Sequence, residues 1–411
     1  MSKKKLYLCA LFDKSLKKMI SVNNIPHILK YMGGKREMLT DIHDALAAMD
    51  AKSDTLCDLF AGTSVVAYAM SDEYDLVVND IQHYSEIFAK CYMNDYSHIF
   101  DIDELVKIIK EKILQYLQLD ILWKGTDTLK YNEDMSYQDM LAVETREREI
   151  IDGREEERGF SLFKRCYSGT YWSYEQCRHI DAIRAVCEQY RGNCMYEAMM
   201  ASLIYAMSYS SQSTGHFAQY RTLTEKNYQD VLQYRMKNVF VMFLKKLKEL
   251  LTTLRYPHTH TLRTSSLDYE DCITTLQPGT IVYADPPYSS VHYSRFYHVL
   301  ETLVKYDNPK VEYKGRYREN RYQSPFDQRT KAKEAFRRLF QKIDQQQCHL
   351  LLSYSDNAMV PIDELKEIAR DVFGEHYKYK YNSKDYQHMK MGRNDVARLD
   401  VHEVLLSFKR I

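Results

Sequence analysis

The stretch DTLCDLFAGTS, residues 54–64, decides the fold of this chain. Residues 54–60 have the make-up of a short buried strand, and apolar residues at helical spacing follow the turn from Val65 to Met70. A second apolar run, DLVVND, closes with Asp80. Strand, glycine turn, helix, strand and acid is the order of a nucleotide-binding βαβ unit. The single glycine does not satisfy G-x-G-x-x-G, so no dinucleotide is implied, and an ordinary turn between strand and helix is the alternative.

The tetrapeptide Asp285-Pro286-Pro287-Tyr288 directly follows another apolar run, residues 280–284. An exocyclic amine of adenine or cytosine is a poor nucleophile because its lone pair is delocalised into the ring. A rigid Asp carboxylate and the carbonyl oxygen of Pro286 can accept the two amine N–H bonds, Pro287 fixes the turn, and Tyr288 can stack on an extruded base. The pattern therefore indicates methylation of a nucleobase amine. A Pro-Pro turn with Tyr288 merely packed in the core is the structural alternative.

Upstream of both motifs, KYMGGK at residues 30–35 precedes a helical pattern at residues 38–46. A flexible glycine pair beside Lys35 suits closure over a charged end of a ligand. A plain loop is the alternative interpretation.

Composition narrows the class of protein. The chain has 411 residues, 45% of them hydrophobic and 28% charged, which predicts a globular protein of two or three domains or one core with a large insertion. No apolar stretch approaches the ~20 residues that span a bilayer, and the Lys-rich start lacks the apolar core of a signal peptide. We therefore expect a cytoplasmic protein without membrane contact. Nine scattered cysteines without a C-x-x-C pair predict buried free thiols and no metal site.

Between residues 100 and 255 the pattern is mostly helical, with expected helices at 102–119, 175–190, 195–208 and 234–251. The polar loop 209–221 carries aromatic residues and one arginine, so it could read or clamp DNA, although loops between helices commonly look like this. Downstream of the tetrapeptide we expect a helix at 294–306 and strands at 349–355, 377–381 and 396–408.

Formal net charge is zero, which argues against a nucleic-acid binder whose whole surface is basic but allows a local basic face. The segment from Lys310 to Arg338 contains ten Lys or Arg against four Asp or Glu, with aromatic residues interleaved. This make-up is typical of a surface that contacts phosphates. A solvated loop followed by a helix start fits the segment equally well.

The motifs KYMGGK, DLFAGTS, VVND, ADPPY and LLLSYS occur in an order that resembles the Dam-like (alpha-group) DNA adenine N6-methyltransferases, which use S-adenosylmethionine. Residues 28–92 and 260–410 carry the resemblance. It implies that Asp285 faces both the target amine and the cofactor, that Asp80 holds the ribose hydroxyls, and that Lys35 serves the methionine end. The full set implied for the cofactor is Tyr31, Gly33, Gly34, Lys35, Asp58, Phe60, Ala61, Gly62, Thr63, Ser64, Asp80 and Asp285.

This chain departs from the group at Leu59 and Ser64, where a proline and a further glycine are common. The longer runs TGHFAQYR and HYSRFYHVLETL also look like a subgroup of these methylases. The resemblance and the basic segment together suggest DNA contacts at His216, Arg221, His292, Arg295, Arg316, Arg318 and Arg321.

We expect an α/β, Rossmann-like methyltransferase core, with a mostly parallel sheet and an antiparallel last strand, interrupted by a helical insertion. The expected parts are residues 1–99 with the cofactor motifs, 100–255 as the insertion and candidate DNA-recognition domain, and 256–411 with the catalytic loop. The expected reaction is methyl transfer to adenine N6 of a flipped base in duplex DNA by a monomer, without a metal. A cognate restriction endonuclease is a further partner that the resemblance allows.

Two other readings of the sequence stay open. The acceptor could be cytosine N4 in DNA or adenine in RNA, although Asp at the first loop position resembles the adenine enzymes more. A DNA-binding protein of this fold that has lost catalysis is the other, and the intact tetrapeptide argues against it.

Overall fold

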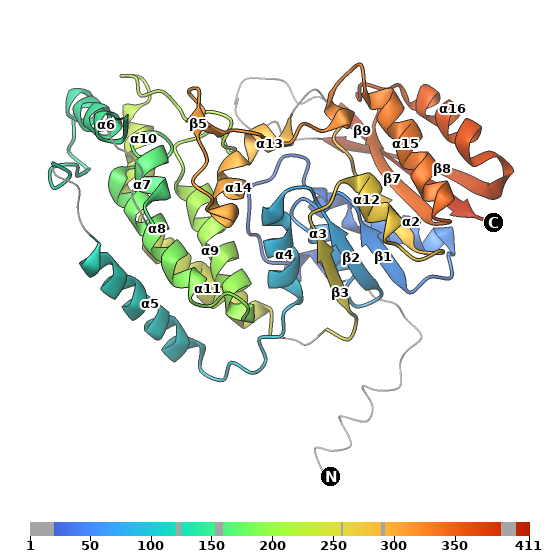
Figure 1. Ribbon diagram of the computed structural model, residues 1–411, viewed down its shortest axis with the longest axis horizontal. Coiled ribbons are helices and arrows are strands. Elements are labelled where there is room, and N and C mark those ends of the chain that lie inside the picture. Colours follow the sequence, from blue (N-terminus) through green and yellow to red (C-terminus); the bar gives the residue numbers. More distant parts are fainter. Residues whose placement is uncertain (1–19, 121–124, 153–158, 256–257, 289–291, 388–399) are drawn as a thin grey trace, which may run out of the picture.

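A computed structural model describes residues 20–120, 125–152, 159–255, 258–288, 292–387 and 400–411 of the chain. Seven strands form one sheet in the order β3-β2-β1-β4-β7-β9-β8, with the helices packed around and beside it (Figure 1). The strands are β1 (Thr55–Asp58), β2 (Asp75–Asn79), β3 (Leu262–Ser265), β4 (Ile281–Ala284), β7 (His349–Ser355), β8 (Tyr377–Gln387) and β9 (Asp400–Arg410).

The first five strands of this order are parallel, and β9 runs antiparallel between β7 and β8. Parallel strands covered on both faces are apolar along their whole length. Accordingly β4 is buried at all four of its residues, as is β7 from Leu350 onwards. The predicted fold class, a mostly parallel sheet with an antiparallel last strand, is confirmed. The strand expected at 396–408 begins in residues outside the described ones, and its described part is β9.

Successive residues of a strand point to opposite faces of the sheet, and each face has its own apolar cluster. Leu56 and Ile281 belong to the cluster shared with α2 (Leu39–Met49), α3 (Val65–Ala69), α4 (His83–Met93) and α14 (His298–Lys305). Their neighbours Cys57 and Val282 belong to the cluster under α12 (Tyr269–Thr274), α15 (Ala332–Gln345) and α16 (Ile362–Phe373). The sheet therefore has helices on both faces.

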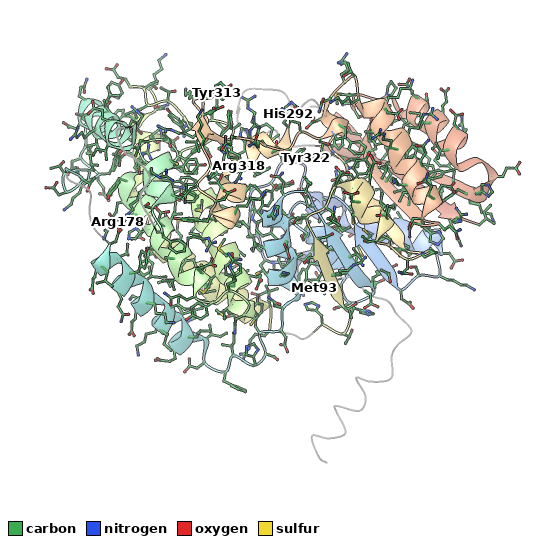
Figure 2. All side chains as sticks on the ribbon, viewed as in Figure 1. Met93, Arg178, His292, Tyr313, Arg318 and Tyr322 are labelled. Carbon is green, nitrogen blue, oxygen red and sulfur yellow. The ribbon has the colours of Figure 1, made fainter. Side chains whose placement is uncertain are left out.

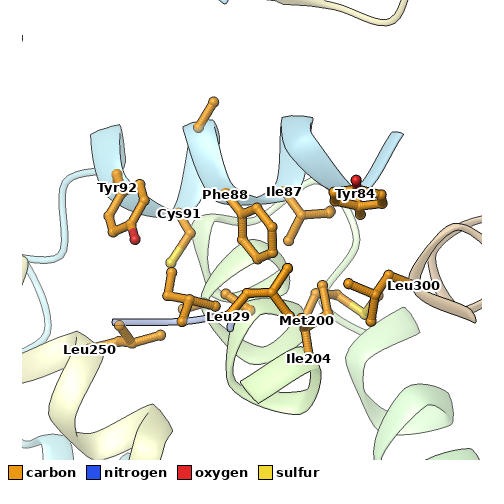
Figure 3. Packing of buried hydrophobic residues seen from close by; sticks show 14 of the residues in the cluster. Leu29, Tyr84, Ile87, Phe88, Cys91, Tyr92, Met200, Ile204, Leu250 and Leu300 are labelled. Atoms are coloured by element: carbon orange, nitrogen blue, oxygen red, sulfur yellow. The ribbon is translucent and has the colours of Figure 1, made fainter. Parts of the chain in front are cut away.

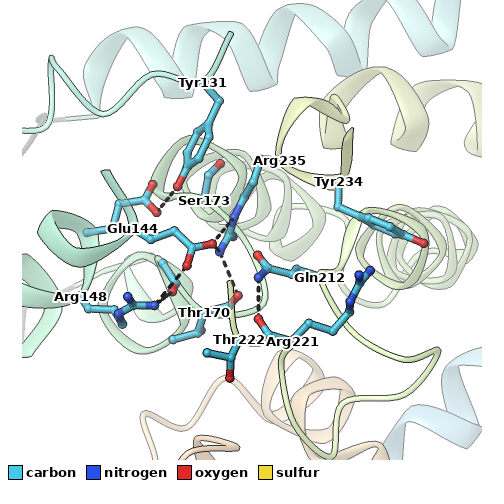
Figure 4. A network of polar contacts seen from close by, with 12 residues as sticks. Tyr131, Glu144, Arg148, Thr170, Ser173, Gln212, Arg221, Thr222, Tyr234 and Arg235 are labelled. Carbon is cyan, nitrogen blue, oxygen red and sulfur yellow. Dashed lines mark hydrogen bonds and ion pairs between the residues drawn. The ribbon is translucent and has the colours of Figure 1, made fainter. Parts of the chain in front are cut away.

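The helical segment between β2 and β3 packs against the sheet half through α4 and shares its apolar cluster. Figure 3 shows Phe88 and Ile87 of α4 facing Met200 and Ile204. A polar network lies within the segment, where buried Arg235 pairs with Glu144 at 2.8 Å (Figure 4). Its helices are α5 (Ile102–Leu119), α6 (Tyr137–Asp152), α7 (Leu162–Tyr167), α8 (Tyr174–Glu188), α9 (Cys194–Ser210), α10 (Tyr228–Met236) and α11 (Val239–Thr253).

Two expected helices are each split. The side chain of Asn238 accepts the Val241 N–H and starts α11, so residues 234–251 are not one helix. Tyr297 separates α13 (Tyr293–Phe296) from α14, and its hydroxyl accepts the Met32 N–H at 2.8 Å. The prediction of a continuous helix is wrong in both places, because a capping side chain or a distant contact outweighs the local apolar pattern.

The basic segment contains a small antiparallel hairpin, β5 (Val311–Glu312) and β6 (Tyr317–Arg318), followed by the 3-10 helix η3 (Pro325–Asp327) and then α15. Three other 3-10 helices are η1 (Val22–Asn24), η2 (Lys35–Met38) and η4 (Gly374–His376). The proposed division of the chain at residues 99 and 255 stays a prediction.

Candidate active site

A cleft with an empty volume of about 840 Å³ lies at the carboxyl end of the sheet. Strands β1 and β4 are neighbours, and the chain continues from β1 to β2 and β3 on one side and from β4 to β7 on the other. Open α/β sheets bind ligands at such a switch point. The cleft is lined by Tyr31, Gly33, Lys35, Leu59, Phe60, Asn79, Asp80, Ile81, Gln82, Tyr84, Leu267, Tyr269, Asp285, Pro286, Pro287, Tyr288, Tyr293, Ser294, Tyr322, Ser324 and Asp327.

The turn after β1 and the acid after β2 are joined by hydrogen bonds. The Gly62 N–H donates to one carboxylate oxygen of Asp80 at 2.9 Å, and the Gln82 N–H donates to the other at 2.8 Å. Burial raises the pKa of Asp80 to about 6, although both N–H bonds favour its ionised form. Each oxygen keeps a further lone pair for a hydroxyl donor. Asp80 is therefore fixed in position and can still accept ribose hydroxyls from the cleft.

Tyr31 forms a wall of the cleft. Two glycines, Gly62 and Gly33, leave the space that the rings of Tyr31 and Tyr293 need. The Tyr31 ring stacks on Tyr297 at 4.6 Å between centroids. Gly62 has φ +52°, and a Cβ there would lie 3.1 Å from the Tyr31 ring. Gly33 has φ +69°, and a Cβ there would lie 3.0 Å from the hydroxyl of Tyr293. A side chain at either glycine would therefore disturb this wall.

Some residues predicted for the cofactor lie behind the cleft surface rather than along it. Asp58 is buried and accepts the Ala67 N–H of α3 at 3.2 Å, and burial raises its pKa to about 8. Ser64 is buried with its hydroxyl donating to the Ser85 carbonyl. Gly34, Ala61, Gly62 and Thr63 are likewise not among the described residues that line the cleft, whereas Tyr31, Gly33, Lys35, Phe60 and Asp80 line it.

The tetrapeptide after β4 reaches the same cleft from the other side. The Asp285 carboxylate lies 3.1 Å from the Lys35 ammonium. The Tyr288 carbonyl accepts the Met359 N–H, which holds the end of the loop, and the Tyr288 ring stands edge-on to Tyr354. The structure therefore brings Asp285, Pro286, Pro287 and Tyr288 together with Lys35 and Asp80.

A residue absent from the sequence prediction completes this group. The carboxylate of Glu403 on β9 is fully buried and lies 3.3 Å from the Lys35 ammonium. It also accepts the Tyr288 hydroxyl at 2.9 Å. Burial disfavours the charged Lys35, but Asp285 and Glu403 outweigh it and the pKa of Lys35 is raised well above its ordinary value. No local motif surrounds Glu403, so the sequence gives no signal for it apart from an acid in an apolar strand.

Asn79 is another residue lining the cleft that sequence reasoning missed. Its amide donates to the carbonyls of Leu59 and Leu267, and its oxygen accepts from Ser265 and from the Leu267 N–H. It thereby ties the ends of β1 and β3 to β2. The sequence hint was its place directly before Asp80.

The residues suggested for DNA contact fall into two groups. His216 lies edge-on to Phe296 beside α13, and burial lowers the pKa of His216 to about 4, so it is neutral at pH 7. Arg221 pairs with Asp230 on α10, and its carbonyl oxygen accepts a hydrogen bond from the Gln212 amide (Figure 4). Both belong to loop 209–221, which is hydrogen-bonded to the sheet half through Phe217 and the Phe296 carbonyl.

The second group lies between the cleft and the hairpin. Figure 2 shows His292, Arg318 and Tyr322 along this edge, with exposed Tyr313 beyond them. His292 lies 2.9 Å from Asp327, which also lines the cleft, and Arg318 pairs with Asp307. Arg316 has a positive φ in the hairpin connection.

Arg295 and Arg321 lie against the same ring, that of Tyr317. Arg295 donates to the Tyr317 hydroxyl at 2.9 Å, and the Arg321 guanidinium lies 4.7 Å from the ring centroid. Burial and then the charge of Arg295 lower the pKa of Arg321. Two like charges held against one ring would be stabilised by an anion.

The features of the cleft suit S-adenosylmethionine. Apolar Leu59, Phe60 and Ile81 can contact an adenine ring, Asp80 can hold ribose hydroxyls, and the Asp285 carboxylate suits a cationic sulfonium. Near the cleft, carboxylate oxygens lie beside a buried ammonium. Such carboxylates suit an organic cation as the ligand.

Comparison with known proteins identifies the class. The sequence profile of the D12 class N6 adenine-specific DNA methyltransferases matches residues 31–351, which is more than half of the chain. The chain belongs to this family.

Relatives come from several bacteria. The chain is 25% identical over 342 residues to the modification methylase LlaI of Lactococcus lactis subsp. lactis and 24% identical over 352 residues to the type II methyltransferase M.FokI of Planomicrobium okeanokoites. Each comparison covers 83% of this chain but only 48% and 47% of the relative, so the chain spans about half their length. It is also 23% identical to the type II methyltransferase M.NlaIII of Neisseria lactamica, covering 89% of this chain and 94% of that protein.

Across the described part of the chain, no helix combines the length and apolar character needed to cross a membrane. The predicted buried free thiols are seen at Cys177 and Cys187, while Cys194 is free and partly exposed.

Proposed function

We propose that the protein transfers a methyl group from S-adenosylmethionine to adenine N6 of a base flipped out of duplex DNA. One observation carries the proposal: Asp285-Pro286-Pro287-Tyr288 ends a central strand at the switch point of the sheet, in one cleft with Asp80 and Lys35. Family membership supports adenine in DNA as the acceptor rather than cytosine or RNA.

S-adenosylmethionine, when bound, supplies an electrophilic methyl group. The residues of the chain would prepare the acceptor. Asp285 and the Pro286 carbonyl would accept the amine N–H bonds and localise the nitrogen lone pair, and Pro287 would keep the turn rigid. Tyr288 would stack on the base, since its hydroxyl is held by Glu403 and its ring remains at the cleft.

The duplex would lie along the edge between the cleft and the helical segment. Arg295 and Arg321 beside Tyr317 offer charge for a phosphate near the flipped nucleotide. His292, Arg316 and Arg318 lie on the same edge, and His216 and Arg221 contribute from loop 209–221. The relative LlaI is named a modification methylase, which supports a cognate restriction endonuclease as a further partner.

Incubating the purified chain with S-adenosylmethionine and plasmid DNA, then digesting to nucleosides for mass spectrometry, tests the proposal. We expect N6-methyladenine and no N4-methylcytosine. Asp285→Ala should lower turnover by ~10²–10³, because it removes an acceptor at the centre where charge develops, while the fold, followed by circular dichroism, stays intact.

Each other outcome argues against a part of the proposal. Methylcytosine in the digest would change the acceptor, and methylation only of RNA supplied in parallel would change the substrate. Unchanged turnover in Asp285→Ala would remove Asp285 from the reaction.

A further inference from the structure

Glu403 is a buried carboxylate that contacts both Lys35, near the cofactor motifs, and Tyr288 of the catalytic loop. It belongs to none of the sequence motifs. It lies on β9, opposite Ser355 of β7, and its side chain is 0% exposed. One oxygen faces the Lys35 ammonium and the other accepts the Tyr288 hydroxyl. The antiparallel strand at the end of the chain is thus connected directly to the cofactor loop and the catalytic loop.

Lys35 stands between two carboxylates, Asp285 at 3.1 Å and Glu403 at 3.3 Å. Its side chain is only 5% exposed, so water screens these charges weakly. The three side chains together carry a net charge of minus one. If Glu403 were neutral, Asp285 alone would balance Lys35, and the group would carry no net charge.

This balance matters because the proposed cofactor brings a positive charge to the cleft. A sulfonium beside Asp285 needs a carboxylate that is not already neutralised by the neighbouring ammonium. With Glu403 ionised, the group and a sulfonium sum to zero. Without that charge they sum to plus one in a poorly solvated place, which is costly. Asp80 lies elsewhere on the cleft wall, and its charge does not differ between these two cases.

We propose that Glu403 is a positioning residue that neutralises Lys35 and so leaves the Asp285 carboxylate available to a cationic sulfonium, which makes the cleft prefer S-adenosylmethionine over its neutral product. Through Tyr288 it also orients the ring on which the base stacks. The inference rests on the proposed function of this cleft and adds a source of selectivity for the charged form of the cofactor.

The test compares three probes that differ in charge at the reacting centre. S-adenosylmethionine is a sulfonium, sinefungin has a carbon in place of the sulfur and an ammonium in place of the methyl group, and S-adenosylhomocysteine is a neutral thioether. Calorimetry on the full chain and on Glu403→Gln gives the affinities without relying on turnover. We expect the substitution to weaken both cationic probes by about tenfold or more relative to S-adenosylhomocysteine, which corresponds to about 1.4 kcal/mol.

A matched control is Asp181→Asn. Asp181 is also buried and accepts the N–H groups of Phe163 and Lys164 and the Tyr306 hydroxyl, but it lies in the helical segment. Asp181→Asn shows what the loss of a buried carboxylate outside the cleft does. It should leave the ratio of the affinities for the cationic probes and for S-adenosylhomocysteine unchanged, even if it changes the stability of the fold.

The outcomes separate the inference from the proposed function. Equal weakening of all three probes in Glu403→Gln would show a purely structural role and overturn the inference. Failure of the unmodified chain to bind any of them would instead overturn the assignment of the cleft. If Glu403→Gln does not fold, Glu403→Asp replaces it. Aspartate keeps the negative charge, so the ratio of affinities for the cationic probes and S-adenosylhomocysteine should stay near that of the unmodified chain. A tenfold change in this ratio would overturn the inference.

Discussion

At the scale of single residues, Gly62 has little freedom to change. Its φ of +52° is costly for other residues, by ~1–2 kcal/mol, and a Cβ would meet the Tyr31 ring at 3.1 Å. Gly62→Ala should therefore push Tyr31 from its stack on Tyr297 and strain the N–H bond to Asp80. We expect weaker binding of S-adenosylmethionine by calorimetry together with lower stability in urea.

Gly192→Ala is the control for that change. Gly192 also has a positive φ, +84°, but a Cβ there would have no neighbour within 4 Å. It should show the backbone cost alone and bind the cofactor normally. Equal binding by both variants would mean that the contact with Tyr31 has no part in forming the pocket.

Asp58 makes a prediction about pH. Its folded pKa of about 8, raised by burial, lies far above its ordinary value of 3.8. The folded protein thus keeps a proton that the unfolded chain releases, and the stability from this group falls as pH rises from about 4 to about 8. Since one pKa unit corresponds to ~1.4 kcal/mol, Asp58→Asn should be more stable than the unmodified chain at pH 9 and nearer to it at pH 5.

Urea unfolding of both proteins at the two pH values measures this. Asp44→Asn is the control, because Asp44 is an exposed carboxylate on α2. Parallel stability curves for Asp58→Asn and the unmodified chain would show that Asp58 is ionised in the folded state, contrary to the expectation.

At the scale of elements, the hairpin of β5 and β6 carries the ring that holds Arg295 and Arg321. If these arginines contact a phosphate, Arg321→Ala should weaken DNA binding about equally for all sequences. It should also reduce the slope of log affinity against log salt by ~0.9, since one fewer counterion is released. Fluorescence titration of duplex DNA at several salt concentrations measures both.

Lys107→Ala removes one positive charge from exposed α5, which lies on the far side of the helical segment (Figure 1). It should leave the slope unchanged. A slope for Arg321→Ala equal to that of the unmodified chain would place Arg321 outside the DNA contact.

How well the sequence predicted an element depended on where its determining contacts lie. Helix 102–119 and the strands before Asp80 and Asp285 were predicted closely, because apolar period and turn chemistry are local. The edge strand β3 and the hairpin escaped notice, since both are short and partly exposed. The roles of single residues were likewise predicted where the determining pattern is local in the sequence.

Lys35 and Asp285 were predicted from motifs, whereas Glu403 was not. Its partners lie 368 and 115 positions away in the chain, and only the sheet order brings β9 beside the cleft. A buried carboxylate with distant partners cannot be distinguished in sequence from an exposed one on the polar face of an edge strand.

At the scale of the whole molecule, the helical segment and one face of the sheet share a single apolar cluster. It joins Leu56 and Ile281 of the sheet to Met200 and Ile204 of α9 and Leu250 of α11. Helix α6 differs, because its apolar residues belong to two small separate clusters with Leu129, Tyr174 and α10. A shared core predicts that α9 and the central strands unfold together, and that α6 can open first.

Native-state hydrogen exchange followed by mass spectrometry tests this. Peptides from α9 and from β1 and β4 should show the same limiting free energy of opening, equal to the global value from urea unfolding. Peptides from α6 should exchange at a lower free energy, because few apolar contacts hold that helix. If α9 instead opened well below β1, the helical segment would be an independent folding unit. The edge between Tyr317 and the cleft would then join two separately stable bodies, and the DNA-contact groups on either side could move apart without unfolding.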